Sequence, residues 1–358
     1  MLFDENSSIQ SYSQEARSIK DGVMPEIEKL IDSGVYLNGK NVEELEQDLS
    51  AYYHFESCAA VSSGTDALIL MMRALGIGSG DTVLTTASTF VAAVEAILAV
   101  GATPQFVDID EDCWQMPMVD FPQGYILVPH LYGYGSLAVH SKCKGVLEDA
   151  SQSIGGLLSN KQLGSLGVCA AISCHPTKNL SAFGDAGFVT STNTELVEKV
   201  KALRNHGQKK FKVHSFSGTT ARIDEFQALV LKHKLRNVQD YIEEKKKIAE
   251  EYRAAFDSLD VRLPIVHPSL TPAPSLFVIR VENRDKFQNH MSKNDIETGI
   301  HYPTPIHMMD AYRQEEWAHV SLPETEKLSM EIVSLPLWYG MKQEHTNKVI
   351  DVVRSYFR

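Results

Sequence analysis

Short apolar runs alternate with helical patterns through the first half of the chain. The runs are rich in β-branched residues, which favours buried strands, and the segments between them place apolar residues at helical spacing. The strand-like runs are 82–86, 104–107, 125–128, 145–147, 170–173 and 187–190, and the helical patterns include 66–75 and 90–100. This alternation predicts an α/β fold with a mostly parallel sheet covered by helices.

The second part of the chain has a different pattern. The long segment 223–256 places charged residues between apolar residues at helical spacing, and it predicts one helix that bridges two domains. Beyond it, a strand is predicted at 275–281, a helix at 284–294, and a further helix at 322–336 that ends at Pro336. We therefore predict a large cofactor-binding domain with an N-terminal arm at 1–235. A bridging helix and a small α+β domain follow at 236–358.

Composition and charge narrow the class of protein. The chain has 358 residues, of which 43% are hydrophobic, so it can bury a large core. Its net charge of -12 argues against a nucleic-acid binder, which needs a positive surface. No apolar stretch is long enough for a membrane span, and the N-terminus has no basic, apolar leader pattern. Five cysteines without a CxxC pair suit a reducing compartment and give no metal-ligand spacing, so we expect a cytoplasmic protein without a metal site.

Lys178 is the most informative candidate for chemistry. It follows a predicted strand and is surrounded by small residues and glycines in SCHPTKNLSAFGDAGFVTS. A lysine in a confined site loses its proton more easily than in water, and the neutral amine is the form that attacks an aldehyde. For a lone lysine, a surface turn is the simpler interpretation. Its neighbours along the chain decide between the two.

Other candidates have a functional and a structural interpretation. Asp149 follows an apolar strand, where ligands of parallel sheets bind, and it either pairs with a pyridine nitrogen or caps a helix. Gln152 lies three residues further on and can reach a ring hydroxyl or ring face. Gly64 and Thr65 open a helix whose free N–H groups hold a phosphate or bind nothing. Phe90 either stacks on a flat ring or only packs.

An ordered set of motifs resembles one enzyme family. SSGTDALIL, ATPQFVDID, EDASQSIGG, HPTKNL with GDAGFVTS, LRNHGQ, GIHYPTPIH and VSLPLWYG follow one another as in the DegT/StrS-type sugar aminotransferases, from about Ser33 to the C-terminus. Each motif alone is weak, but the ordered set is specific. The resemblance implies fold type I of the pyridoxal-phosphate enzymes, pyridoxal 5′-phosphate as cofactor, and a homodimer with active sites at the subunit interface.

The same resemblance assigns roles to individual residues. It places Lys178 on the Schiff-base lysine, Asp149 on the partner of the pyridine nitrogen, and Gln152 beside the ring oxygen. It places the remaining cofactor contacts on Ser173, Gly64 and Thr65 for the phosphate and Phe90 for ring stacking, and the substrate contacts on His301 and Tyr302.

Two departures from the family pattern concern the site. The asparagine of the G-x-N-x-R stretch, which the neighbouring subunit supplies to the cofactor phosphate, is Thr220 here, whose shorter side chain puts that contact in doubt. The aromatic residue and the histidine that often precede the strand at 275–281 are replaced by Pro274 and Ser275. The substrate pocket is expected to differ there.

The resemblance implies transfer of an amino group, with glutamate as the expected donor, to a keto group of a nucleotide-linked sugar. The motif HYPTPIH favours carbon 3 of a dTDP-linked deoxy sugar. One alternative is the branch that removes a sugar hydroxyl, but its members carry histidine at the position of Lys178. Another is a non-catalytic regulatory protein with the same fold. The sequence leaves the sugar, the base, the aminated carbon and the pathway open.

Overall fold

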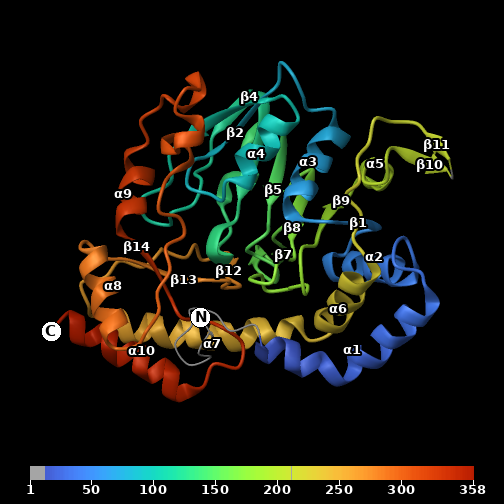
Figure 1. Cartoon of the computed structure of the whole chain (residues 1–358). Helices are drawn as coiled ribbons and strands as arrows, with labels where there is room; N and C mark the ends of the chain where they lie inside the picture. Colours follow the sequence, from blue (N-terminus) through green and yellow to red (C-terminus); the bar gives the residue numbers. More distant parts are fainter. Residues whose placement is uncertain (1–12, 211) are drawn as a thin grey trace.

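The computed structural model describes residues 13–210 and 212–358, and this part of the chain is built around a seven-stranded sheet (Figure 1). The strands lie in the order β1 (Ser57–Val61), β9 (Gly187–Ser191), β8 (Cys169–Ser173), β5 (Lys142–Asp149), β4 (Asp120–Pro129), β2 (Thr82–Thr86) and β3 (Thr103–Val107). β8, β5, β4, β2 and β3 are parallel, whereas β9 is antiparallel to β8 and β1 is antiparallel to β9. The predicted mostly parallel sheet is confirmed.

Helices cover both faces of this sheet (Figure 1). They and the helices that follow are α1 (Ser13–Ser33), α2 (Lys40–Tyr53), α3 (Gly64–Leu75), α4 (Ala92–Ala99), α5 (Thr194–Leu203), α6 (Glu225–Leu235), α7 (Val238–Phe256), α8 (Arg284–Lys293), α9 (Pro323–Glu331) and α10 (Gln343–Tyr356). α3, α4 and α5 form a core with strand residues such as Leu127 and Val189, and α2 and α6 form another with Ile172 and Phe188. Burial from both sides explains why the inner strands read as short runs of apolar and β-branched residues.

The C-terminal part has its own core, which α7, α8 and α10 form with a two-stranded sheet of β13 (Phe277–Arg280) and β14 (Ile332–Leu335). Two sequence expectations are wrong here. The helix expected at 223–256 is two helices, since α6 ends at Leu235 and α7 begins at Val238. The helix expected at 322–336 stops at Glu331, because the next four residues pair with β13 and bury their side chains.

Short elements complete the described residues. They are β6 (Leu157–Leu158), β7 (Lys161–Gln162), β10 (Gln208–Lys210), β11 (Val213–His214), β12 (Leu270–Thr271) and the 3₁₀ helices Leu131–Gly133, Leu137–His140, Ile306–Met308, Asp310–Tyr312 and Glu316–Ala318. β10 and β11 form a hairpin beside α5 at the edge of the molecule (Figure 1). Among the described helices, none combines the length and the apolar character that crossing a membrane requires.

Candidate active site

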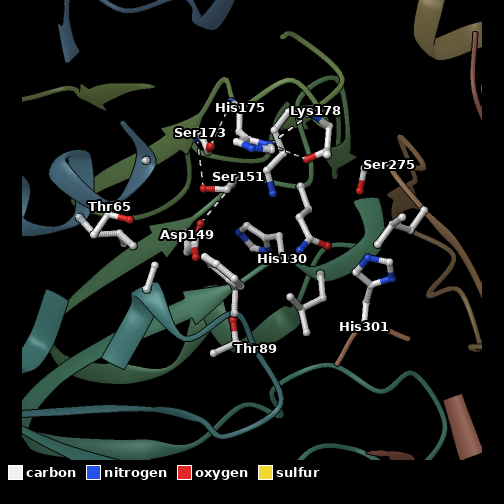
Figure 2. A pocket seen from close by; sticks show the side chains of 18 of the residues that line it. Thr65, Thr89, His130, Asp149, Ser151, Ser173, His175, Lys178, Ser275 and His301 are labelled. Atoms are coloured by element: carbon white, nitrogen blue, oxygen red, sulfur yellow. Dashed lines mark hydrogen bonds between the residues drawn. The ribbon is translucent and has the colours of Figure 1, made fainter. Parts of the chain in front are cut away.

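A cavity of about 380 Å³ lies at the carboxyl ends of the parallel strands (Figure 2). β4, β5 and β8 lead into it, because His130, Asp149 and Ser173 follow or end these strands. Ligands of open α/β sheets bind at this edge, where loops from several strands converge. Of the residues predicted from the sequence, the cavity is lined by Gly64, Thr65, Phe90, Asp149, Gln152, Ser173, Lys178, His301 and Tyr302.

Lys178 lies in the loop between β8 and β9, and its side chain points into the cavity (Figure 2). Its backbone N–H donates to the carbonyl of His175, which closes a turn over 2.9 Å. Burial lowers the pKa of the Lys178 amine, while the nearby Asp149 and Cys174 act in the opposite direction. The amine is therefore easier to deprotonate than that of an exposed lysine, and the neutral form is the nucleophile.

Asp149 is held by a chain of hydrogen bonds between two parallel strands. Its Oδ1 accepts from the backbone N–H of Ser151 over 3.1 Å, and Ser151 Oγ accepts from the N–H of Ser173 over 3.1 Å (Figure 2). A turn leading to the short strand β6 follows Asp149. The alternative of a helix-capping aspartate is therefore wrong, and the carboxylate faces the same cavity as Lys178.

The start of α3 forms a cradle against the end of β8. Ser63 caps the helix by accepting from the N–H of Asp66 over 3.0 Å, which leaves the N–H groups of Gly64 and Thr65 beside the cavity. A Cβ at Gly64 would lie 2.6 Å from Cβ of Ser173, so only glycine allows this close approach. Free N–H groups and the helix dipole favour an anion, and a serine hydroxyl adds a donor.

A second group of contacts joins the cavity to the C-terminal part. Gln152 Oε1 accepts from the N–H of Tyr132 over 2.8 Å, and its Nε2 donates to the Tyr302 hydroxyl over 3.0 Å. The rings of Phe90 and Tyr302 lie 5.6 Å apart between centroids. Burial, with a smaller effect from Lys178, lowers the pKa of His301 to about 4, so this imidazole is neutral at ordinary pH.

His130 is a cavity residue that the sequence reasoning missed (Figure 2). Its Nδ1 accepts from the N–H of Ser136 over 3.1 Å, so Nε2 carries the proton and donates to Glu148 over 2.9 Å. Both side chains of this pair are fully buried. The available signal was the one used for Asp149, because His130 also follows directly on a parallel strand.

Thr220 does not reach the cavity of its own chain. Thr220 lies on the segment that precedes α6, and its hydroxyl lies 2.8 Å from Nε2 of His206. Arg222 on the same segment donates to the side chain of Asn205 over 3.0 Å. A contact from Thr220 to the cofactor site of a neighbouring subunit therefore stays a prediction.

The donor set around the cavity fits pyridoxal phosphate. Lys178 would supply an amine of lowered pKa for the aldehyde, Asp149 a carboxylate for the protonated ring nitrogen, and the cradle formed by Gly64, Thr65 and Ser173 would hold the phosphate. Few other small molecules need an amine nucleophile, a carboxylate and a phosphate cradle together. Fold and site thus define the class of pyridoxal-phosphate-dependent aminotransferases.

Comparison with known proteins agrees with this class. The chain belongs to the DegT/DnrJ/EryC1/StrS aminotransferase family, whose model matches residues 17–354, and the cofactor of this family is pyridoxal 5′-phosphate. It is 35% identical over 92% of its length to the dTDP-3-amino-3,4,6-trideoxy-alpha-D-glucose transaminase of Streptomyces venezuelae, covering 90% of that protein. It is 36% identical over 91% of its length to the erythromycin biosynthesis sensory transduction protein EryC1 of Saccharopolyspora erythraea, covering 93% of it.

A solved structure shares the whole fold. S. venezuelae DesV in complex with a ketimine intermediate matches with a TM-score of 0.93 and 32% identity, covering 98% of both chains. The resemblance inferred from the motifs is thereby confirmed at the level of family, fold and cofactor. The roles of individual residues remain predictions.

Proposed function

We propose that this aminotransferase moves an amino group, with glutamate as donor, to a keto group of a nucleotide-linked sugar. The observation that carries the proposal is the meeting of Lys178, Asp149 and the start of α3 around one cavity. The name of the S. venezuelae relative supports a dTDP-linked deoxy sugar and carbon 3 as the aminated position. A second cavity of about 390 Å³ adjoins the first at Phe90 and Tyr302, which leaves room for a substrate larger than the cofactor.

When bound, pyridoxal phosphate supplies an aldehyde that combines with amines and a ring that withdraws electrons. Lys178 Nζ would take a proton from the carbon that bears the amino group of the donor, as a general base, and would deliver it to the carbon on the other side of that nitrogen, as a general acid. The carboxylate of Asp149 would accept a hydrogen bond from the protonated ring nitrogen and so keep that proton in place. Gln152 has one amide N–H left after its bond to Tyr302, and this N–H can donate to the ring oxygen.

A homodimer with shared sites is part of the proposal. Exposed apolar side chains of Val35, Tyr36, Leu37 and Phe183 support a subunit interface, because hydrophobic groups of this size seldom gather on a free surface. They belong to neighbouring segments, since the N–H of Phe183 donates to Gln227 near the start of α6 and Tyr36 stacks on Phe226. All five cysteines are free thiols, which supports a cytoplasmic location.

The first test uses Lys178→Ala. This variant lacks the amine that holds the aldehyde and moves the proton, so turnover should fall to the background rate and the visible absorbance of the lysine-bound cofactor should disappear. Transamination near the wild-type rate would contradict the role of Lys178. A panel of nucleotide-linked 3-keto and 4-keto sugars, offered to the wild type with glutamate, then identifies the substrate by the product formed.

A regulatory role is the second candidate, because one similar protein, EryC1, is named as a sensory transduction protein. The two functions differ in what the bound cofactor does. In an aminotransferase, glutamate alone should bleach the visible absorbance as the amino group is taken up. A protein that binds the cofactor only for regulation should keep its absorbance unchanged under the same conditions.

A further inference from the structure

Asn179, next to Lys178, joins three segments of the cavity wall. Its Nδ2 donates to the carbonyl of Ile154 over 3.2 Å and to the carbonyl of Ala273 over 3.1 Å. Ile154 lies two residues after Gln152, and Ala273 lies two residues before Ser275, which lines the cavity. One buried amide therefore connects the lysine loop with the two loops that carry the groups facing Lys178.

A buried lysine fixes the orientation of this amide. Lys245 on α7 donates from Nζ to Oδ1 of Asn179 over 2.6 Å. An ammonium group only donates hydrogen bonds and a carbonyl only accepts them, so the oxygen must face Lys245 and the nitrogen must face Ile154 and Ala273. With the amide reversed, all three contacts would be lost at once.

Lys245 is held at a high cost in desolvation. It is 4% exposed, and Asn179 is its hydrogen-bond partner among the described residues. Burial lowers the pKa of its amine, Glu15 acts in the opposite direction, and Lys234 adds to the lowering. A leucine or methionine would fill the same space without burying an amine, so the hydrogen bond to Asn179 is the gain that offsets this cost.

Lys232 offers a comparison on the neighbouring helix α6. It is also buried, at 7% exposed, and it donates to Oδ1 of Asn41 over 3.2 Å and to Glu44. These contacts join α6 to α2 and lie outside the loop of Lys178. Lys232 and Lys245 therefore share burial and an amide acceptor but differ in the segment that they hold. Lys234 does not serve as this comparison, because it donates to Ser181 Oγ over 2.6 Å, in the same loop as Lys178.

We propose that Lys245 and Asn179 are positioning residues for Lys178, which hold its loop at the correct distance from Asp149 and Gln152. This inference rests on the proposed role of Lys178. Neither residue touches the cavity, so both act through the lysine loop. Loss of the hydrogen bonds of Asn179 leaves the Lys178 amine free to move. A displacement of about 1 Å lowers the rate of an enzymatic step by up to about a hundredfold.

The test compares five variants of the holoenzyme: Lys245→Met, Asn179→Leu, the double variant, Lys245→Gln, and Lys232→Met as matched control. The readouts are kcat, KM for glutamate, the pH midpoint of the visible absorbance of the lysine-bound cofactor, and the Tm of each apoprotein. Lys245→Met and Asn179→Leu should each lower kcat about tenfold or more, with KM changed less than about threefold, and should shift the midpoint by about half a pH unit or more.

The double variant should be no worse than either single variant, because both changes remove one interaction. Lys232→Met should lower the Tm while leaving kcat and the midpoint as in the wild type, because Lys232 joins α6 to α2 and not to the lysine loop. Lys245→Gln, which keeps an N–H donor without the charge, should retain the wild-type midpoint. If Lys245→Met gives no soluble enzyme, Asn179→Leu and Lys245→Gln decide the question by the same midpoint criterion.

A wild-type midpoint and kcat in Lys245→Met and Asn179→Leu would overturn the proposal, and so would additive effects in the double variant. Equal effects of Lys232→Met would show that the loss of any buried lysine here acts through stability alone. Failure of the proposed function has a different signature, because visible absorbance would then survive Lys178→Ala. That result would overturn both proposals. A wild-type pH midpoint in Lys245→Met, together with loss of the visible absorbance in Lys178→Ala, would overturn only the positioning role of Lys245 and Asn179.

Discussion

Gly64→Ala tests how closely α3 must approach β8. The added Cβ would lie 2.6 Å from Cβ and 3.1 Å from Cα of Ser173, whereas carbon atoms normally approach to about 3.5–4.0 Å. Relief of this contact requires a shift of about 1 Å. Overpacking costs about 1–3 kcal/mol, and alanine in place of glycine in a helix returns about 0.5–1 kcal/mol. The apoprotein should therefore lose about 0–2.5 kcal/mol of stability.

The effect on the cofactor is a separate loss, which appears in Kd and not in the unfolding of the apoprotein. The same shift separates the N–H groups of α3 from Ser173 and opens the phosphate cradle, so Kd for pyridoxal phosphate should rise at least about tenfold, or 1.4 kcal/mol. Titration of apoprotein with the cofactor, followed by absorbance, measures Kd, and thermal unfolding of apoprotein measures stability.

Ser63→Ala is the control for this experiment. It removes the capping bond to Asp66, which costs about 1 kcal/mol, but it adds no atom at the cradle and Ser63 does not line the cavity. Its Tm should fall while Kd changes less than about threefold. The reasoning is refuted if Gly64→Ala keeps the wild-type Kd, or if Ser63→Ala weakens the cofactor as much as Gly64→Ala does.

Three further outcomes are expected. Asp149→Asn should bind cofactor but turn over at least about a hundredfold more slowly, because the ring nitrogen loses its anionic partner; an unchanged kcat would contradict this. Lys178→Met should stabilise the apoprotein near neutral pH, because the folded pKa of Lys178 is lowered by burial and the wild type binds fewer protons when folded. The wild type gains stability as pH rises from the lowered pKa toward the unfolded value of about 10.4. Urea titrations should therefore show that the difference in free energy of unfolding between Lys178→Met and the wild type shrinks toward pH 10. Finally, mixing inactive Lys178→Ala chains with inactive chains altered at both Thr220 and Arg222 should restore activity at one site of each hybrid dimer; no recovery after proven subunit exchange would exclude shared sites.

The sheet could be predicted from the sequence because its strands are buried on both faces. Runs such as 82–86 and 187–190 combine apolar and β-branched residues that are almost all buried, and turn residues separate them from the helices. The break between α6 and α7 has no such signal, since Arg236 and Asn237 fit an exposed helix surface as well as a turn. Burial of β14 against β13 depends on residues far away in sequence, so local periodicity extended the preceding helix through it.

The residues of the candidate site could likewise be predicted where a local sequence pattern marks them. Lys178, Asp149 and Gly64 stand in motifs with a strong local pattern, and the fold brings them to one cavity. His130 lacks such a motif and was recognised only from its place at the end of β4. The use of Thr220 depends on a second chain, so neither one sequence nor one subunit decides it. The division of the chain after residue 235 likewise stays a prediction.

The order in which the cavity wall is synthesised has a consequence for the nascent chain. The last strand of the central sheet ends at Ser191, but His301 and Tyr302 emerge from the ribosome about 110 residues later. At ~5–20 residues per second, the sheet is available for roughly ten seconds before its wall is complete. During this interval Phe90 and the edge around it lack the covering ring of Tyr302. A chain truncated before His301 should therefore expose this edge of the cavity and aggregate more readily than the full chain.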